Sequence, residues 1–302
     1  MKIAIIGSTS KLAVGYLRHS RLPRNFFYPF SRSASNTFNL PNLAADKFEI
    51  AGLANLDYDV VINFVALADI NQCEKDPNLA FALNSKVVKY LSSLYMSSKT
   101  HFIHISTDMI YDFSGDSSHS SKEIEINVPT NMYAYSKYCG ESYALRVPFS
   151  TVVRTNFYGL FESSSLYDFF WNKFITNEAT VDGYSDVRFS PISIKSFSEV
   201  LDLLIERKLT GLYNLGSRDS ISKFNFALQI RNAMSEYVKT STNIRSVQAA
   251  NSWPRNDFKS QNMSMDCSAL ECALGIKLPE VCYDLRDYTI RTLREYLRHS
   301  QR

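Results

Sequence analysis

The chain is poor in glycine and cysteine for its length, and it lacks the features of several classes of protein. It contains only 10 glycines and 5 cysteines in 302 residues. The cysteines are odd in number and lack the paired spacing of a metal site, so we expect reduced thiols, as in cytosolic proteins. The five histidines form no metal pattern either. We therefore predict neither a disulfide framework nor a metal centre.

Charge and hydropathy argue against two further classes. The net charge is +3, from 33 basic and 30 acidic residues, and no run of five or more like charges occurs, so no nucleic-acid partner is predicted. No apolar stretch reaches the roughly 18 residues that a membrane-spanning helix needs. Residues 1–7 lead directly into a turn and a polar helix, which indicates a first strand rather than a signal segment. We expect a cytoplasmic protein without a membrane partner.

Strand-like and helix-like segments alternate along much of the chain. Apolar runs predict strands at residues 2–7, 25–30, 58–65, 101–106, 149–155 and 212–215. Helices are predicted up to about residue 20, over residues 77–98 and over residues 131–146. This alternation predicts an α/β fold, a Rossmann-type doubly wound parallel sheet with a smaller C-terminal substrate-binding lobe.

The same pattern suggests a division into domains. We assign residues 1–155 to a dinucleotide-binding Rossmann domain, to which residues 191–216 return. Residues 156–190 and 217–302 show a less regular pattern and are assigned mainly to the substrate-binding lobe. Ligands bind at the carboxyl ends of the strands in such folds, so we expect the lobe to cover that edge of the sheet.

A tyrosine and a lysine four residues apart form the most informative motif. Tyr133 and Lys137 fall in the predicted helix 131–146, and their spacing places both side chains on one helix face. A free phenol titrates near pKa ~10, and a neighbouring ammonium lowers that pKa by favouring the phenolate. Thr107 ends a nearby strand, where its hydroxyl can hold a carbonyl oxygen. We predict that these three residues are catalytic, in carbonyl reduction or alcohol oxidation with a nicotinamide cofactor.

The Tyr-x-x-x-Lys spacing occurs a second time, at Tyr95 and Lys99, which shows how easily it arises. That copy precedes the strand predicted at residues 101–106, so it belongs to the amino end of the sheet, away from ligands. Tyr133 and Lys137 instead follow the carboxyl end of that strand. Position in the fold therefore separates the two copies.

The turn after the first strand is a weak match to a dinucleotide-binding loop. Such loops need glycines for a tight turn and for close approach of the pyrophosphate, whereas residues 7–13 read Gly-Ser-Thr-Ser-Lys-Leu-Ala. On its own, this segment is explained equally well by an ordinary strand–turn–helix. Small residues still fit, and a hydroxyl or ammonium can bind a phosphate at a helix amino terminus. The residues that we assign to the cofactor here are Gly7, Thr9, Ser10, Lys11 and Leu12.

No acidic residue follows the second predicted strand, which ends in Ser31-Arg32-Ser33. An Asp or Glu there would bind the ribose 2′-hydroxyl, whereas an arginine with a neighbouring hydroxyl suits a 2′-phosphate. Arg32 and Ser33 therefore favour NADP(H) over NAD(H) as the cofactor. A solvated surface arginine is the other interpretation of Arg32.

Together these segments resemble the dTDP-4-dehydrorhamnose reductase family of the extended short-chain dehydrogenase/reductase superfamily. Residues 106–112 match the family's Ser-Thr-Asp-x-x-x-Asp, and residues 131–141 match Asn-x-Tyr-x-x-[Ser/Thr]-Lys-x-x-Gly-Glu throughout. Residues 154–156 and 262–266 resemble further family segments, so the likeness covers most of the chain. The main departure is the phosphate loop, where the family usually has Gly-x-Thr-Gly-x-x-Gly.

The resemblance implies NAD(P)H-dependent reduction of a nucleotide-linked 4-keto-6-deoxy sugar in polysaccharide biosynthesis. Tyr133 would donate the proton, Lys137 would tune Tyr133 and hold the nicotinamide ribose, and Thr107 would polarise the carbonyl. Residues that the resemblance adds to the cofactor site are Ala66, Asn84 and Ser106. Residues that it assigns to the nucleotide-sugar substrate are Asp108, Asn156, Arg255 and Asn262. A homodimer is considered, although no motif decides it.

Three alternative functions stay open. Sugar-nucleotide dehydratases usually carry Asp-Glu after the threonine, but here the pair is Asp108-Met109, which disfavours dehydration. Epimerases usually have an intact glycine loop and an acidic residue after the second strand, and this chain has neither. A non-catalytic binding or regulatory member of the family would explain the eroded loop. Such a member would not need Thr107, Tyr133 and Lys137 together.

Overall fold

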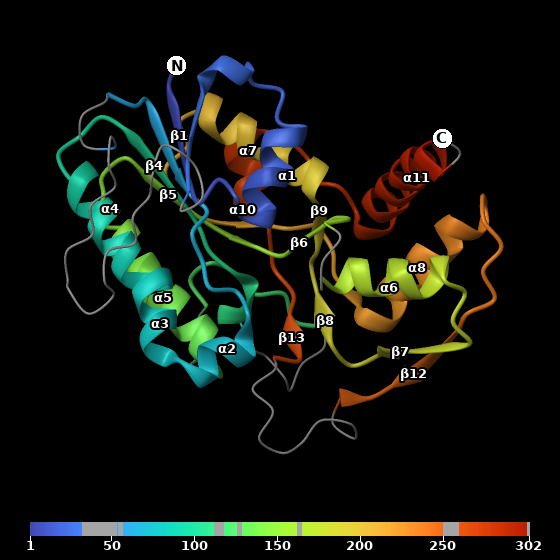
Figure 1. Ribbon diagram of the computed structural model, residues 1–302. Coiled ribbons are helices and arrows are strands. Elements are labelled where there is room, and N and C mark those ends of the chain that lie inside the picture. Colours follow the sequence, from blue (N-terminus) through green and yellow to red (C-terminus); the bar gives the residue numbers. More distant parts are fainter. Residues whose placement is uncertain are drawn as a thin grey trace.

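A six-stranded parallel sheet forms the centre of the molecule (Figure 1). The computed structural model describes residues 1–31, 53, 57–111, 118–125, 129–161, 165–249 and 260–300. The sheet order is β10–β5–β4–β3–β1–β2, and every neighbouring pair is parallel. The strands are β1 (Ile3–Ile6), β2 (Phe27–Phe30), β3 (Val60–Asn63), β4 (His101–Ile105), β5 (Ser150–Thr155) and β10 (Gly211–Leu215). The predicted doubly wound Rossmann-type sheet is confirmed.

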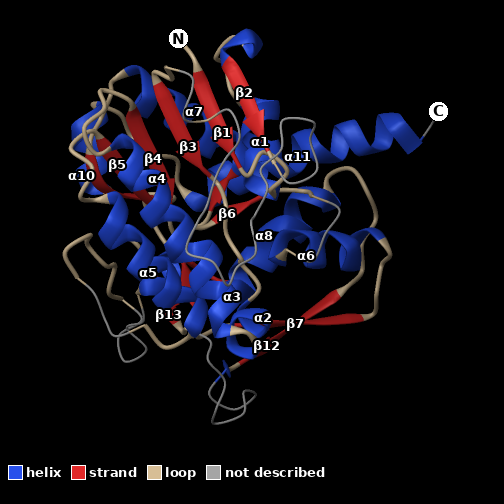
Figure 2. Ribbon diagram, turned by 60° about the vertical axis from the view of Figure 1, so that its left-hand side comes forward, coloured by secondary structure: helices blue, strands red, loops and turns tan. Residues whose placement is uncertain are grey.

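Helices cover both faces of this sheet, which is why its inner strands are apolar along nearly their whole length (Figures 1 and 2). Side chains alternate between the faces, so Ile3 and Ile5 join one core cluster, and Ala4 and Ile6 join the other. The first cluster includes residues of α1 and α7, and the second includes residues of α4 and α5. Their bounds are α1 (Lys11–His19), α4 (Val87–Tyr95), α5 (Met132–Ala144) and α7 (Ile194–Glu206).

The helix predicted over residues 77–98 is interrupted by a π-helical turn. Its parts are α3 (Pro77–Phe81), the π-helical segment η2 (Ala82–Lys86) and α4, and a short helix α2 (Ile70–Lys75) precedes them. Within the turn, Asn84 is fully buried. Its amide nitrogen donates to the Leu67 carbonyl (3.1 Å) and to the Ser136 hydroxyl (2.9 Å), and its oxygen accepts from Leu67 N–H (2.8 Å). Asn84 thus holds the segment after β3 against α5.

Gly140 allows α5 to lie directly on this π-helical turn. A Cβ atom at that position would come 2.3 Å from the backbone oxygen of Asn84, which is too close for any real contact. We expect Gly140→Ala to lower the free energy of unfolding by about 2–3 kcal/mol, the range of overpacked cores. Ser142→Ala, on the exposed side of the same helix, should change it by less than about 0.5 kcal/mol. Chemical denaturation measures both, and equal stability of the two variants would contradict the close packing.

The region with the less regular sequence pattern contains well-formed helices. Ser165 and Ser222 cap two of them by accepting N–H groups of the first turn, at 3.1 Å in each case. The helices are α6 (Leu166–Ile175), α8 (Lys223–Ser235), α10 (Ser268–Leu274) and α11 (Val281–Ser300). Nearby short strands are β6 (Phe157–Tyr158), β7 (Thr180–Tyr184), β8 (Arg188–Phe189), β9 (Ile192–Ser193), β11 (Ile221–Ser222), β12 (Asn243–Val247) and β13 (Asn262–Met263). The helix α10 contacts β10 of the central sheet. The proposed division into two domains stays a prediction.

A buried carboxylate ties α11 to the start of α7. Asp284 accepts hydrogen bonds from Ser193 N–H (2.6 Å) and from the hydroxyls of Ser193 (2.8 Å), Ser196 (2.6 Å) and Tyr158 (2.9 Å). These partners lie 88 to 126 residues away in the chain.

Across the described ranges, no helix is both long enough and apolar enough to cross a bilayer.

Candidate active site

The predicted site residues gather at the carboxyl edge of the sheet. The chain order reverses at β1, which lies between β2 and β3, and such a switch point is where ligands bind in open α/β sheets. Gly7 follows β1, Ala66 follows β3, Thr107 follows β4 and Asn156 follows β5. Tyr133 reaches the same edge from the first turn of α5. Arg32, Ser33 and Arg255 lie outside the described residues.

The turn after β1, where we expect the phosphate cradle, is tight despite its missing glycines. Gly7 has φ +81°, and a Cβ there would come 2.9 Å from the backbone nitrogen of Val65. The N–H groups of Gly7 and Ser8 both donate to the Phe30 carbonyl at 3.0 Å, which fixes the turn. Ser10 caps α1 by accepting Ala13 N–H at 3.3 Å. The one position that needs glycine has kept it, and the first turn of α1 is free of acidic residues.

The other residues assigned to the cofactor differ in how they could contact it. Thr9, Lys11 and Ala66 are exposed, whereas the Leu12 side chain packs in the core, so only its backbone is suited to ligand contact. The Ser106 hydroxyl is buried and has no hydrogen-bond partner, as expected of a group reserved for a ligand. The assignment of Asn84 to the cofactor is not supported by its contacts, because its amide already binds Leu67 and Ser136. The residues present fit a dinucleotide.

Tyr133 and Thr107 come together as predicted, but the pKa of Tyr133 moves in the direction opposite to our expectation. Burial, with smaller contributions from the nearby Asp108 and Cys73, raises this pKa to about 12, although Thr107 opposes the shift. The expected lowering by Lys137 was therefore wrong for this structure. Burial disfavours the phenolate more than the neighbouring hydroxyl favours it. Tyr133 keeps its proton at neutral pH and is suited to act as an acid.

Lys137 is almost fully buried beneath the site. Its side chain is 2% exposed, and its ammonium donates to the Ile105 carbonyl at 2.5 Å. Burial lowers the pKa of Lys137 to about 8, and the Glu141 carboxylate opposes that shift. Burial and the charge of Lys137 hold the pKa of His104 well below its usual value, so His104 is neutral. Lys137 therefore carries a positive charge below about pH 8 and is neutral above it.

Asp108 is held below the Thr107 hydroxyl. Its carboxyl group is 1% exposed and accepts from the Asn156 amide at 2.7 Å and from Thr107 at 3.4 Å. Burial raises the pKa of Asp108 to about 7, although hydrogen bonds from Asn156 and Thr107 and the charge of Lys223 oppose this shift. The structure therefore brings together Asp108 and Asn156, both assigned to the substrate. Asp108 faces protein groups with both oxygens.

The Asn262 side chain forms hydrogen bonds with backbone groups on both sides of its amide. Its amide nitrogen donates to the His119 carbonyl at 3.0 Å, and its oxygen accepts Ser264 N–H at 3.1 Å. It lies in β13, which contacts the 3₁₀ helix η3 (Asp108–Ile110). These bonds give Asn262 a role in holding the segment around residue 119 beside the site.

Comparison with known proteins decides the family. The sequence profile described as the RmlD substrate binding domain matches residues 1–293. The chain belongs to this RmlD family. A dTDP-4-dehydrorhamnose reductase of Aggregatibacter actinomycetemcomitans is 23% identical over 228 residues, 72% of this chain and 76% of the relative. A protein of the same name from Sinorhizobium fredii is 22% identical over 297 residues, 92% of this chain and 93% of the relative.

Solved structures agree on the RmlD-family fold. The dTDP-4-dehydrorhamnose reductase of Bacillus anthracis, solved in complex with NADP, superposes with a TM-score of 0.81. That alignment covers 96% of this chain and 99% of the other, at 20% sequence identity. The resemblance stated from the sequence motifs is thereby confirmed.

Sequence reasoning left one buried ion pair of this RmlD-family protein without a role. Glu141 was matched to the family motif, but its fully buried partner Arg154 binds it through two nitrogens, at 2.7 and 2.9 Å. Arg154 also donates to the Tyr111 hydroxyl at 2.6 Å, and Tyr111 donates to Asn214 at 2.8 Å. The chain of contacts thus joins α5, β5 and β10. Family segments singled out both Glu141 and Arg154 in the sequence, but nothing local showed that the two pair.

Two further residues were missed for the same reason. Glu74 of α2 accepts the backbone N–H of Met132 at 2.7 Å and so anchors the first turn of the helix that carries Tyr133. Lys223 begins α8 and lies near enough to Asp108 to lower its pKa. Both contacts join segments far apart in the chain, and neither residue belongs to a recognisable motif.

Two hollows lie in the C-terminal region. The α6–β7 hollow has a volume of about 360 Å³ and includes Lys223, which links it to Asp108. Its other lining residues include Phe169, Lys173, Tyr184 and Arg245.

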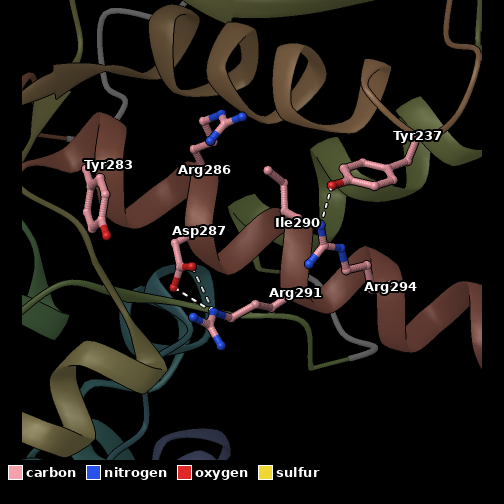
Figure 3. A pocket seen from close by; sticks show the side chains of 7 residues that line it. All are labelled: Tyr237, Tyr283, Arg286, Asp287, Ile290, Arg291 and Arg294. Carbon is pink, nitrogen blue, oxygen red and sulfur yellow. Dashed lines mark hydrogen bonds and ion pairs between the residues drawn. The ribbon is translucent and has the colours of Figure 1, made fainter.

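The second hollow, the α11 groove of about 370 Å³, is lined by seven residues (Figure 3). None of them belongs to the predicted site. Its arginines are already paired, Arg286 with Glu236, Arg291 with Asp287, and Arg294 with the Tyr237 hydroxyl. Two cations of the α6–β7 hollow are paired as well, Lys173 with Glu178 and Arg245 with Asp182.

Proposed function

We propose that this protein is an NADPH-dependent reductase of a nucleotide-linked 4-keto-6-deoxy sugar, acting in the cytoplasm. The observation that carries the proposal is the placement of Tyr133, in the first turn of α5, near Thr107, which follows β4 at the carboxyl edge of the sheet. This is the same edge of the sheet as the switch point at β1, where a dinucleotide binds in related folds. Membership in the RmlD family supports the proposal, and so does the similarity of the chain to relatives named dTDP-4-dehydrorhamnose reductase.

The chemical direction follows from the proton affinities of the site. A reduction ends with a proton given to the alkoxide oxygen, so the donor must still hold its proton at neutral pH. Tyr133, with its pKa raised to about 12, meets that requirement. Thr107 is placed to hydrogen-bond the carbonyl oxygen, and Lys137 remains charged below about pH 8. NADPH, when bound, supplies the hydride.

The α6–β7 hollow is the proposed place of the nucleotide diphosphate. It joins two aromatic rings, Phe169 and Tyr184, with the cation Lys223, whereas Lys173 and Arg245 are paired with Glu178 and Asp182. Aromatic rings suit a nucleobase, and cations suit a diphosphate. The volume of about 360 Å³ falls in the range of small-molecule sites. Lys223, whose charge acts on Asp108, would then connect the diphosphate end of the substrate to the reacting sugar.

Cofactor titration is the direct test of this proposal. We expect micromolar binding of NADPH by calorimetry, weaker binding of NADH, and loss of that difference in Arg32→Ala. Loss of one charge-assisted phosphate contact weakens NADPH by about ten- to a hundredfold. Arg24→Ala is the matched control, since its guanidinium donates to the Arg18 carbonyl, and it should bind NADPH like the wild type.

The outcome of the titration also decides between the two candidate functions. Binding justifies turnover assays with 4-keto nucleotide sugars, followed by loss of NADPH absorbance. Failure to bind either cofactor would contradict the reductase and leave a non-catalytic, nucleotide- or sugar-binding family member. The two glycines missing from the loop at residues 10 and 13 are the observation that favours this second candidate.

A further inference from the structure

Tyr133 lies in the part of its helix that has the fewest bonds of its own. It is the second residue of α5, and the first N–H groups of a helix have no partners within that helix. Asn131 satisfies one of these groups, because its side-chain oxygen accepts Ala134 N–H at 2.8 Å. The remaining N–H groups of the first turn need partners from outside α5.

Glu74 of α2 supplies such a partner. Its Oε1 atom accepts the N–H of Met132, the residue before Tyr133, at 2.7 Å. The two bonded residues are 58 positions apart in the chain. A carboxylate is favourable at the positive amino end of a helix, and its hydrogen bonds are stronger than those of a neutral acceptor. Glu74 thus fixes the backbone on the amino side of Tyr133.

A second contact fixes the carboxyl side of the same residue. The Ser136 hydroxyl donates to the Tyr133 carbonyl at 2.9 Å, and it accepts from the amide nitrogen of Asn84, also at 2.9 Å. Asn84 belongs to η2, and Glu74 belongs to α2. Both residues therefore lie between β3 and β4, and they hold the backbone around Tyr133 from two sides.

Both contacts lead back to Leu67, in the segment that follows β3. Asn84 accepts Leu67 N–H at 2.8 Å and donates to the Leu67 carbonyl at 3.1 Å. Cys73, the neighbour of Glu74 in α2, donates its thiol to the same carbonyl at 3.3 Å. Leu67 directly follows Ala66, which we assign to the cofactor. This edge of the expected cofactor site is thus joined to the first turn of α5 by two separate connections.

We propose that Glu74 is a positioning residue, which together with Asn84 holds Tyr133 in place relative to the cofactor-binding edge of the sheet. The inference rests on the proposed reductase function and deepens it. In a reduction, the hydride and the proton reach one carbonyl group from the cofactor and from Tyr133. A shift of about 1 Å between these two groups is therefore costly. Glu74 acts through the backbone of Met132, so it does not have to touch the sugar.

Removal of the Glu74–Met132 bond should lower kcat and leave cofactor binding intact. We expect Glu74→Ala to lower kcat by about ten- to a hundredfold, the cost of a misplacement of about 1 Å. The KM for NADPH should stay at the wild-type value, because Asn84 still holds Leu67. Glu74→Gln keeps an oxygen that can accept Met132 N–H, so it should restore most of kcat.

Asp59 provides a matched control at the other end of the sheet. Its carboxylate accepts the backbone N–H of Lys2, also at 2.7 Å, and these two residues are 57 positions apart. Asp59→Ala therefore removes a bond of the same kind and length, and its kcat should equal that of the wild type. An equal fall of kcat in Asp59→Ala and Glu74→Ala would indicate a general loss of stability and would overturn the positioning role.

Amide exchange of Met132 tests the Glu74–Met132 bond without any substrate. The chain has 7 methionines, so labelling with ¹⁵N-methionine gives a sparse spectrum in which this amide can be followed. Loss of a hydrogen bond to a charged group should speed its exchange about tenfold or more in Glu74→Ala. Asp59→Ala should leave the exchange rate unchanged.

The two measurements separate this proposal from that of the reductase. Unchanged exchange of Met132 in Glu74→Ala would overturn the positioning role whatever the substrate. Wild-type kcat in Glu74→Ala would overturn it while leaving the reductase intact. A wild-type protein that turns over no 4-keto nucleotide sugar would count against the reductase, and the exchange rates would still decide whether Glu74 holds the first turn of α5.

Discussion

Tyr133→Phe is expected to lower turnover by about 10²–10⁴-fold, the usual contribution of a positioned general acid. The phenol is the group of the site that keeps its proton, since burial raises its pKa to about 12, and phenylalanine offers none in its place. NADPH affinity should change little, because the cradle after β1 and the amino end of α1 do not involve Tyr133. Steady-state rates and calorimetric titration of the same preparation measure both quantities.

The second Tyr-x-x-x-Lys copy provides a matched control for this experiment. Tyr95 ends α4, stacks on Phe102 with ring centroids 6.1 Å apart, and buries a hydroxyl without a hydrogen-bond partner. Tyr95→Phe therefore removes the same atom from the other end of the sheet and should leave turnover unchanged. Wild-type turnover in Tyr133→Phe, or an equal loss in both variants, would refute the assignment of the proton donor.

Arg154→Met is expected to lower the free energy of unfolding by about 3–5 kcal/mol, the cost of leaving one buried charge without its partner. Glu141 would stay behind almost fully buried, at 1% exposed, with its two bonds from Arg154 gone. Arg154 also donates hydrogen bonds to the Tyr111 hydroxyl and to the Glu123 carbonyl, and the substitution removes both. Urea denaturation followed by circular dichroism measures the change.

An exposed ion pair of the α11 groove tests whether burial is the reason for the large loss of stability expected in Arg154→Met. Arg286 binds both carboxylate oxygens of Glu236, at 2.9 and 3.0 Å, but it is 58% exposed. Arg286→Met should therefore cost less than about 1 kcal/mol. The double variant Arg154→Met with Glu141→Leu should recover part of the loss, because no unpaired charge remains. A small effect of Arg154→Met alone would show that the pair is not needed for stability.

The sequence was sufficient for those parts of the fold and site that rest on local pattern. Continuous apolar runs located the six strands, because a strand covered on both faces has no polar alternation. Helical spacing and strand order located Tyr133 and Lys137 at the carboxyl edge. Gly7 was recognisable because a positive φ at that turn requires glycine.

Features that depend on tertiary contacts were not predictable in this way. The π-helical turn directs the Asn84 side chain toward Leu67 and Ser136. Helical periodicity in the sequence does not reveal such a turn. The pKa of Tyr133 depends on how deeply its ring is buried, and spacing to Lys137 says nothing about depth. The elevated pKa of Asp108 has the same origin, since a carboxyl after a strand can be solvated or enclosed.

The bonds to Asp284 have a consequence for the order in which a ribosome can complete this protein. Ser193 and Tyr158 are synthesised 91 and 126 residues before the carboxylate that satisfies them. Residues 264–266 likewise supply the bonds to Ser121 and Asn214 long after those residues have left the ribosome. The six strands can pair once β10 has emerged, but these bonds form only when the later segments follow. A nascent chain can thus have its central sheet before α11 and residues 264–266 are tied to the rest of the fold.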